Sequence, residues 1–380
     1  MLPFFAASFV AFGVVLVLPG VHQADLARAL ELDLARSGLL ASALAAGLGV
    51  GVVGAGPLFD RMRRRPLFLL GFGVAAAALL SVRDGMSFER WLAHVAAAGF
   101  GIGFYDTLIN AAVAERYRAA AARPMSLVHA AATVGAMGGP LLAALAAPRG
   151  GFVASFHWVG AAHLVLAGWA CAISFPERQP GGSQASSAPD AGAPSPDPAW
   201  RLGSTLLPFA AVAFAYVGVE ASLTVFAVPY ATGALGFSAA RGATAISALW
   251  LGLLLGRVGV LGLPRSLGAR TLVGAGALAA CVLLAGVALR VGLVEVTFLA
   301  TGVALGCVYP LMMALVGERV PHARGTAAGL AAGAGALGGT AVPWLTGSIG
   351  DAAGVTVALG SLAGWCALIA VAAGAARGIR

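Results

Sequence analysis

Two acidic residues, Asp106 and Glu220, lie inside long apolar stretches of the sequence. Ionisable side chains are costly inside a membrane, so those that occur there are candidates for function. Asn110 lies one helical turn after Asp106, and Tyr216 lies one turn before Glu220, so each pair would share a helix face. A carboxyl group held away from water can load and release a proton near neutral pH, as a proton-coupled carrier requires. A hydrogen bond to a neighbouring helix is the structural alternative.

Asp106 is expected near the middle of its helix. It precedes Glu115, which marks the helix end, by nine residues, and that length of helix spans about 14 Å. Gly99, Gly103, Asp106 and Asn110 recur at helical spacing and form a stripe of small and polar side chains. Such stripes are typical of helix faces packed inside a membrane protein. We therefore expect Asp106 and Asn110 to face the centre of a helical bundle.

Further residues are weaker candidates for the same site. His129 is a candidate proton relay, with a packed, hydrogen-bonded histidine as the alternative. Tyr105, Trp250 and Tyr309 are candidates for amphipathic cavity walls, but core packing or an interfacial belt explains each of them as well. Arg257 either holds an anionic solute or extends its charged end toward the membrane surface. The predicted substrate and coupling site consists of Tyr105, Asp106, Asn110, His129, Tyr216, Glu220, Trp250 and Tyr309.

The composition places this site in a membrane protein. Of 380 residues, 60% are hydrophobic and 10% are charged, and the mean hydropathy is +0.92. Soluble domains carry about 25% charged residues. All 23 basic residues are Arg and the pI is about 10.2, but arginines retained in cytoplasmic loops account for this basicity. We therefore predict a lipid bilayer, and not a nucleic acid, as the partner of this surface.

Apolar runs close to the ~20 residues that cross a bilayer as a helix recur twelve times. They cover residues 3–21, 37–59, 66–82, 91–114, 126–147 and 152–174, and then 205–230, 240–261, 271–290, 293–316, 324–347 and 353–375. A stretch rich in Pro, Gly, Ser and Ala separates the two sets and is expected to be flexible. The expected fold is an all-α integral membrane protein, with a six-helix bundle at 1–175, a cytoplasmic linker at 176–203 and a second six-helix bundle at 204–380.

The two sets of helices resemble each other in sequence. Segment 103–116 (GFYDTLINAAVAER) aligns without a gap with segment 306–319 (GCVYPLMMALVGER), and GAMGGP at 135–140 corresponds to GALGGT at 335–340. Parallel repeats of this kind are typical of secondary transporters. The larger share of the arginines falls on the side that holds both termini, so the positive-inside rule predicts cytoplasmic termini in a cell (plasma or inner) membrane.

A cluster of charge, GPLFDRMRRRP, connects the second and third apolar runs at residues 56–66. It contains the pattern G-x-x-x-D-R-x-x-R-R, formed by Gly56, Asp60, Arg61, Arg64 and Arg65. Together with the twelve spans and the repeat, this motif resembles the major facilitator superfamily over the whole chain. The chain departs from the family pattern at Arg63, where that family usually has Gly.

The resemblance implies a moving interface at this motif. In that family the acid of the motif latches the two halves together, in the outward-open state, at the N-terminus of the eleventh helix. A helix N-terminus offers unsatisfied N–H groups and a partial positive charge. The implied conformational gate comprises Gly56, Asp60, Arg61, Arg64, Arg65 and Arg324. A topology signal alone is the alternative explanation of the arginines.

A narrower resemblance concerns three segments, GIGFYDTLINAAVAERY, SLVHAAATVGAMGGPLL and FAYVGVEASLTVFAVPY. They are similar to segments of the fucose–proton symporters and their sodium-dependent glucose relatives. An acid on the fourth helix of that group is tied to coupling, and the resemblance places this role on Asp106. A second acid of that group falls near Gly20 and His22, so its site is absent here. The resemblance implies transport of a small solute coupled to a proton or a sodium ion.

The inventory of side chains leaves two solute classes open. One Asn and three Gln, the latter all expected in loops, are few for a sugar site, in which amides and hydroxyls replace water. Two acids beside aromatic residues would also suit an amphipathic cation. Uptake of a small, sugar-like solute and proton-driven efflux of drugs or amphipathic metabolites are the alternatives. The sequence shows no nucleotide-binding loop or catalytic cluster, so we expect neither an enzyme nor a bound cofactor or metal. The 6+6 repeat favours a carrier over a pore assembled from several chains, so we expect a monomer.

Overall fold

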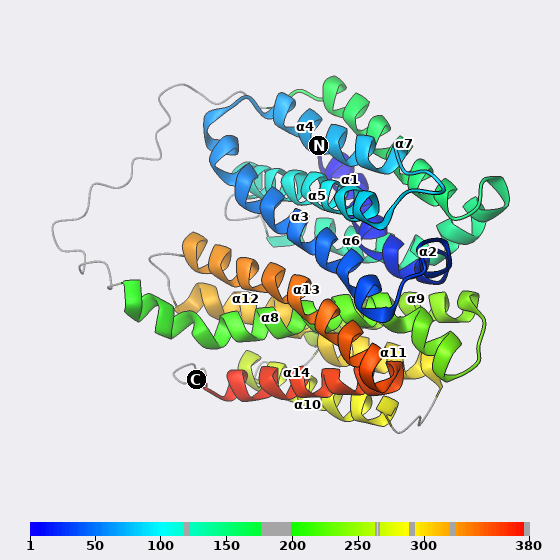
Figure 1. Ribbon diagram of the computed structural model, residues 1–380. Helices are drawn as coiled ribbons and strands as arrows, with labels where there is room; N and C mark the ends of the chain where they lie inside the picture. The colour runs from blue at the N-terminus through cyan, green and yellow to red at the C-terminus, as the bar shows by residue number, and fades with distance from the viewer. Residues whose placement is uncertain are drawn as a thin grey trace.

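The computed structural model describes residues 1–117, 122–175, 199–262, 264, 267–288, 293–319 and 324–375. The regular elements of this part are all helical (Figure 1). The first half contains α1 (Leu2–Val21), α2 (Gln23–Leu30), α3 (Leu34–Arg61), α4 (Arg64–Leu80), α5 (Phe88–Tyr117), α6 (Ala122–Ala146) and α7 (Val153–Ala172). The second half contains α8 (Ala199–Pro229), α9 (Ala239–Gly259), α10 (Ala269–Ala288), α11 (Val294–Gly306), α12 (Val308–Arg319), α13 (Arg324–Ala353) and α14 (Val355–Ala375). Short turns η2 (Ala147–Arg149), η3 (Tyr230–Ala234) and η4 (Val260–Gly262) extend α6, α8 and α9.

The helices account for the twelve predicted membrane spans. Within the described residues, ten segments are long and apolar enough to cross a membrane, with α11 and α12 together forming one of them. The 17-residue α4 and the 30-residue α13 supply the other two spans. Residues 176–198 of the predicted linker lie outside the described residues, and α8 begins at Ala199, earlier than expected. Gln23, expected in a loop, begins α2 and is buried, where its amide donates to Ser37 Oγ at 3.0 Å.

The tenth span is broken, although the sequence was interpreted as one continuous helix. α11 ends at Gly306 and α12 begins at Val308. Pro310 explains the break, because a proline has no N–H to donate to the carbonyl four residues earlier, here that of Gly306, and its ring clashes with that carbonyl. The corresponding residue of the first half is Thr107, and α5 runs through this position without interruption.

Both halves are built around the same close helix pair. A Cβ at Gly51 of α3 would lie 2.2 Å from the Phe100 carbonyl oxygen of α5. In the second half, a Cβ at Gly256 of α9 would lie 2.3 Å from the Val303 carbonyl oxygen of α11. Only glycine allows backbones to approach this closely, and membrane helices use such contacts for packing. One hydrophobic cluster lies within the first half, and the other consists mainly of second-half residues together with five residues of the first half.

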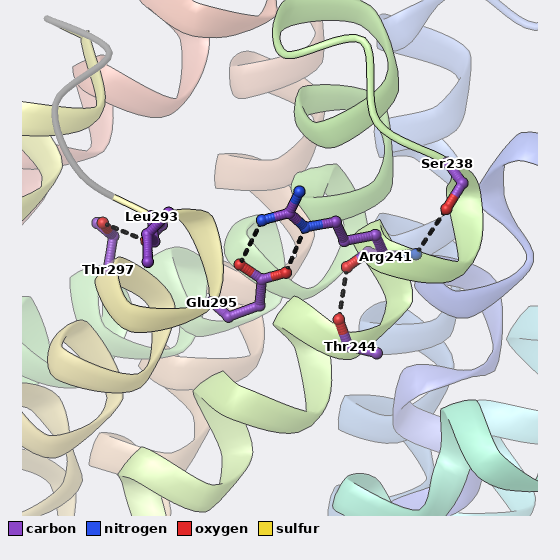
Figure 2. A network of polar contacts seen from close by, with 6 residues as sticks. All are labelled: Ser238, Arg241, Thr244, Leu293, Glu295 and Thr297. Carbon is purple, nitrogen blue, oxygen red and sulfur yellow. Dashed lines mark hydrogen bonds and ion pairs between the residues drawn. The ribbon is translucent and has the colours of Figure 1, made fainter.

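The second half carries an ion pair between its two closely packed helices (Figure 2). Arg241 of α9 donates from Nε to Glu295 Oε1 at 2.7 Å and from Nη2 to Glu295 Oε2 at 3.4 Å. Ser238 caps α9 by accepting from the Arg241 backbone N–H at 3.3 Å. The guanidinium therefore binds a carboxylate through its Nε and Nη2 edge, near the helix ends and away from the centre of the bundle.

The halves touch at one end of the bundle and separate toward the other (Figure 1). We call the end that holds the 56–66 motif the arginine end, and the end that holds α2 the opposite end. Toward the opposite end, α3 lies against α13, where a Cβ at Gly38 would be 2.3 Å from the Pro343 carbonyl oxygen. Toward the arginine end, a Cβ at Gly54 or Gly56 would meet nothing within 4 Å. The two helices thus diverge along their length.

Candidate functional site

The acidic residue of α5 lies in a short chain of hydrogen bonds. Asn110, one turn further along the helix, donates from Nδ2 to Asp106 Oδ1 at 2.9 Å. The other amide atom, Asn110 Oδ1, is 3.0 Å from Nε2 of His129 on α6. Because a carbonyl oxygen only accepts, His129 donates from Nε2 in this arrangement. The chain Asp106–Asn110–His129 therefore links two helices of the first half through side chains alone.

These polar side chains are not sealed inside a helical half. His129 is exposed, and Asp106 and Asn110 are half-buried. The His129 ring meets the ring of Phe9 edge to face at 5.2 Å, which fixes the imidazole against α1. The three residues are therefore accessible in the present arrangement, as a site that exchanges protons or solute with water must be.

The second half presents a matching group from α8, α9 and α12. Tyr216 and Glu220 of α8 are joined by a side-chain hydrogen bond. Arg257 of α9 reaches the Tyr216 hydroxyl from Nη2 at 3.4 Å. The ring of Tyr309 packs against that of Tyr216 at 5.4 Å, and Tyr309 interacts electrostatically with both Asp106 and Glu220. Tyr309 thus lies near enough to the acid of each half to interact with its charge.

A side-chain hydrogen bond joins the polar groups of the two halves. Arg257 donates from Nη1 to Thr133 Oγ1 on α6 at 3.0 Å. The Thr133 hydroxyl in turn donates to the His129 carbonyl oxygen at 3.4 Å. Nearby, Ser247 of α9 donates to the Met137 carbonyl oxygen of α6 at 2.8 Å. Arg257 therefore points into the interface between the halves and does not extend toward the membrane surface.

Three buried polar atoms of the second half have no hydrogen-bond partner among the described residues. They are Glu220 Oε2, Trp250 Nε1 and Arg257 Nε. Buried polar groups are normally satisfied, so each unpartnered one needs an explanation. One is a carboxylate acceptor on α8 and the other two are N–H donors two turns apart on α9, and a polar molecule bound at these helices would satisfy groups of this kind.

Not all predicted site residues join this cluster. Tyr105 is fully buried in the first half, where its ring packs on Phe72 at 4.5 Å. Its hydroxyl donates to the Ser8 carbonyl oxygen at 3.3 Å and lies 3.2 Å from His163 Nε2. Adjacent residues on a helix point about 100° apart, so Tyr105 faces away from Asp106. Asp106, Asn110 and His129 are brought together, and so are Tyr216, Glu220 and Tyr309.

The residues of the predicted gate lie at the arginine end. Arg64 forms an ion pair with Glu115 at the end of α5, and its guanidinium lies 4.9 Å from the ring centroid of Phe59. Arg65 donates to the Ile173 carbonyl oxygen at 3.2 Å, and Arg61 is exposed. The side chains of Asp60 and Arg324 lie outside the described part of the structure.

Three contacts of the site and its surroundings were not anticipated from the sequence. Thr133 was not singled out, and Glu115 was used only to mark a helix end. Asp351 near the end of α13 accepts from the backbone N–H groups of Leu34 and Ala35, each at 2.8 Å. The available signal for Asp351 was an acid close to the end of an apolar span. It lies opposite a helix that starts in the other half, and a negative charge is favourable at such a helix N-terminus.

Comparisons with known proteins agree with this architecture. The family model of the Major Facilitator Superfamily matches residues 3–343. No curated protein matches. A bacterial homologue of the human lysosomal transporter Spinster, solved in an inward-facing and occupied conformation, superposes with a TM-score of 0.76 at 16% identity over 99% of this chain and 96% of that chain.

Two solved sugar symporters have the same fold. The D-xylose–proton symporter gives a TM-score of 0.75 at 15% identity, covering 99% of this chain and 96% of that one. The Escherichia coli fucose–proton symporter FucP, in its N162A form, gives 0.68 at 18% identity, covering 100% and 98%. At these identities the likeness concerns the fold.

Proposed function

The chain belongs to the Major Facilitator Superfamily and is a multi-pass membrane transporter rather than an enzyme, and we propose that it moves a small organic solute by alternating access, coupled to protons. The observation that carries this proposal is the hydrogen bond between Arg257 and Thr133. It connects two groups of ionisable residues from opposite halves in the middle of an apolar bundle. Transporters of this architecture bind substrate at the interface of their repeats.

The arrangement of α3 and α13 supports alternating access. The helices are locked at the opposite end by backbone contacts of Gly38 and by Asp351, whereas Gly54 and Gly56 face open space. With the arginine end in the cytoplasm, as the positive-inside rule favours, this arrangement is inward-open. Both termini would then be cytoplasmic, in the plasma or inner membrane, and the carrier is proposed to act as a monomer.

Proton coupling is assigned to the hydrogen-bonded chain of the first half. Asp106 and His129 are both titratable, and Asn110 links them. Protonation of Asp106 removes its negative charge and reverses the role of one oxygen from acceptor to donor, which requires the amide and the imidazole to rearrange. The solved xylose and fucose transporters of this fold are proton symporters, and a sodium ion is the alternative coupling ion.

The charge of the site favours one of the two solute classes. Arginine stays protonated in proteins, so Arg257 places a permanent positive charge beside Tyr216. A lipophilic cation would be repelled by it, which disfavours the efflux antiporter. A polar solute that accepts hydrogen bonds, including a sugar-like one, suits Arg257 and Trp250.

The test uses purified protein in proteoliposomes that enclose a pH-sensitive dye. Sugars, sugar acids, amino acids, hydroxy acids and lipophilic cations are added singly, and the internal pH is recorded. We expect acidification of the lumen with at least one polar solute, and none in protein-free vesicles. Electrogenic solute entry that follows a sodium gradient and leaves the internal pH unchanged would reject proton coupling.

A further inference from the structure

One edge of the Arg257 guanidinium is only partly satisfied by the described residues. Its Nη1 donates to Thr133 Oγ1 at 3.0 Å, and its Nη2 reaches the Tyr216 hydroxyl at 3.4 Å. Its Nε is buried and has no partner among the described residues. The Nε and Nη2 groups of an arginine form a planar two-donor fork. In Arg257 this fork holds one weak hydrogen bond and one vacant donor.

Another arginine of the same helix shows what such a fork binds in this protein. Arg241 uses Nε and Nη2 to hold the two carboxylate oxygens of Glu295, at 2.7 and 3.4 Å (Figure 2). Bidentate pairing of a guanidinium with a carboxylate combines charge with matched geometry. Arg257 presents the same edge without the carboxylate.

Glu220 does not fill this position. Among the described residues the ion pairs include none between Arg257 and Glu220, although the two interact electrostatically. The Tyr216 hydroxyl contacts both side chains and so lies between them. Arg257 and Glu220 therefore form a separated charge pair. Each side chain keeps one buried atom without a hydrogen-bond partner among the described residues, Glu220 Oε2 and Arg257 Nε. Buried charges are normally paired or hydrogen-bonded in full.

We infer that the transported solute carries a carboxylate, which binds the Nε and Nη2 edge of Arg257. The inference rests on the proposed transport function and names the solute class of that site. The buried indole N–H of Trp250 supplies a further unpartnered donor on the same helix. Glu220 Oε2 accepts from a donor of the solute, such as a hydroxyl or an amino group next to the carboxylate. Hydroxy acids, sugar acids and amino acids have this chemistry.

Binding is measured with matched pairs of probes that differ in the carboxylate. Lactate is compared with lactamide, gluconate with glucose, and alanine with alaninamide, each by its effect on the thermal unfolding midpoint of the detergent-solubilised protein at constant ionic strength. A ligand that binds only the folded state stabilises it by RT ln(1 + L/Kd), where L is the free ligand concentration, so the midpoint rises with the ligand concentration relative to Kd. We expect a carboxylate member to raise it and its neutral partner to leave it unchanged.

Three arginine variants test whether the effect depends on the fork. Arg257→Lys keeps the positive charge and loses the planar two-donor edge, and the carboxylate concentration that gives a set rise in the midpoint should increase about tenfold or more. Arg241→Lys makes the same change on the same helix outside the site and should leave it unchanged. Arg257→Gln tests loss of the charge, and its unliganded midpoint shows whether the variant is folded.

Three results would overturn the inference. They are equal stabilisation by both members of every effective pair, wild-type affinity for the carboxylate in Arg257→Lys, and no stabilisation by any carboxylate. Different results would reject the proposed transport function. Proton flux driven by glucose but not by gluconate would support transport and reject a carboxylate solute. Gluconate binding without proton flux from any solute would support the carboxylate site and reject proton-coupled transport.

Discussion

The carboxylate of Asp351 caps a helix that belongs to the other half of the molecule, accepting from the Leu34 backbone N–H at 2.8 Å. It also accepts from the N–H of the next residue, Ala35, at 2.8 Å. The third free N–H of α3, that of Arg36, is bound by Asp33 of the same helix at 2.7 Å. Two acids thus cap one helix N-terminus, but only Asp351 connects the halves. In the family-derived gate, Asp60 would make the reciprocal contact at the arginine end.

Replacing Asp351 by Ala should weaken closure of the opposite end. A lost cap costs about 1 kcal/mol, which corresponds to a roughly fivefold shift in population. Spin labels at Glu31 and Ala352, in a background without the four free cysteines, would report longer distances in Asp351→Ala. Asp33→Ala removes a cap within one half and serves as the matched control. An unchanged distance distribution in Asp351→Ala would exclude a latch at this end.

Gly56 and Gly47 of α3 should respond oppositely to the same substitution. A Cβ at Gly56 meets open space, whereas one at Gly47 would lie 1.9 Å from the Ala96 carbonyl oxygen. Gly56→Val should therefore fold normally and block approach of α3 to α13 at the arginine end, slowing transport. Gly47→Val should lower stability by about 1–3 kcal/mol or more. Thermal unfolding and transport rates distinguish the two, and normal transport in Gly56→Val would show that the helices need not meet there.

Asp60→Asn tests the latch at the arginine end. A negative charge at a helix N-terminus contributes about 0.3–1 kcal/mol, and up to about 2 in partly buried positions. Transport should slow by roughly two- to thirtyfold, with expression and topology unchanged. Arg63→Gln removes a neighbouring exposed charge that is not part of the predicted gate, and controls for general effects on this loop. Wild-type transport in Asp60→Asn would leave only the topology signal as the role of the motif.

The turn between α1 and α2 should show a pH dependence of its own. A hydrogen bond from His22, together with the charges of His22 and Arg28, holds the pKa of Asp25 below its usual value of 3.8, against the effect of partial burial. Because the folded state lowers this pKa, the contribution of Asp25 to stability is present above pH 3.8 and is lost as the pH falls further. The stability difference between wild type and Asp25→Asn, followed from pH 6 to pH 3, should therefore shrink only below about pH 4. A stability difference that stays constant down to pH 3 would contradict the predicted role of Asp25.

Much of the fold could be predicted because membrane spans have a fixed minimum length and an apolar composition. The break at Cys307 was also encoded, by Pro310, but was missed because hydropathy does not register a lost backbone hydrogen bond. Within the site, the pairing of Asp106 with Asn110 could be predicted, because helical spacing places both on one face of the same helix. The contact of Arg257 with Thr133 joins residues 124 positions apart. It depends on how the two halves pack, which periodicity along a single helix cannot specify.

The most direct test of the account compares two transport modes in Asp106→Asn, using the solute identified by the internal-pH screen. Exchange of labelled for unlabelled solute needs no net proton movement, whereas accumulation against a gradient does. We predict that exchange persists and that accumulation driven by a pH gradient falls at least about tenfold, while Glu89→Gln, at an exposed position at the start of the same helix, behaves like wild type. Full gradient-driven accumulation in Asp106→Asn would contradict the account.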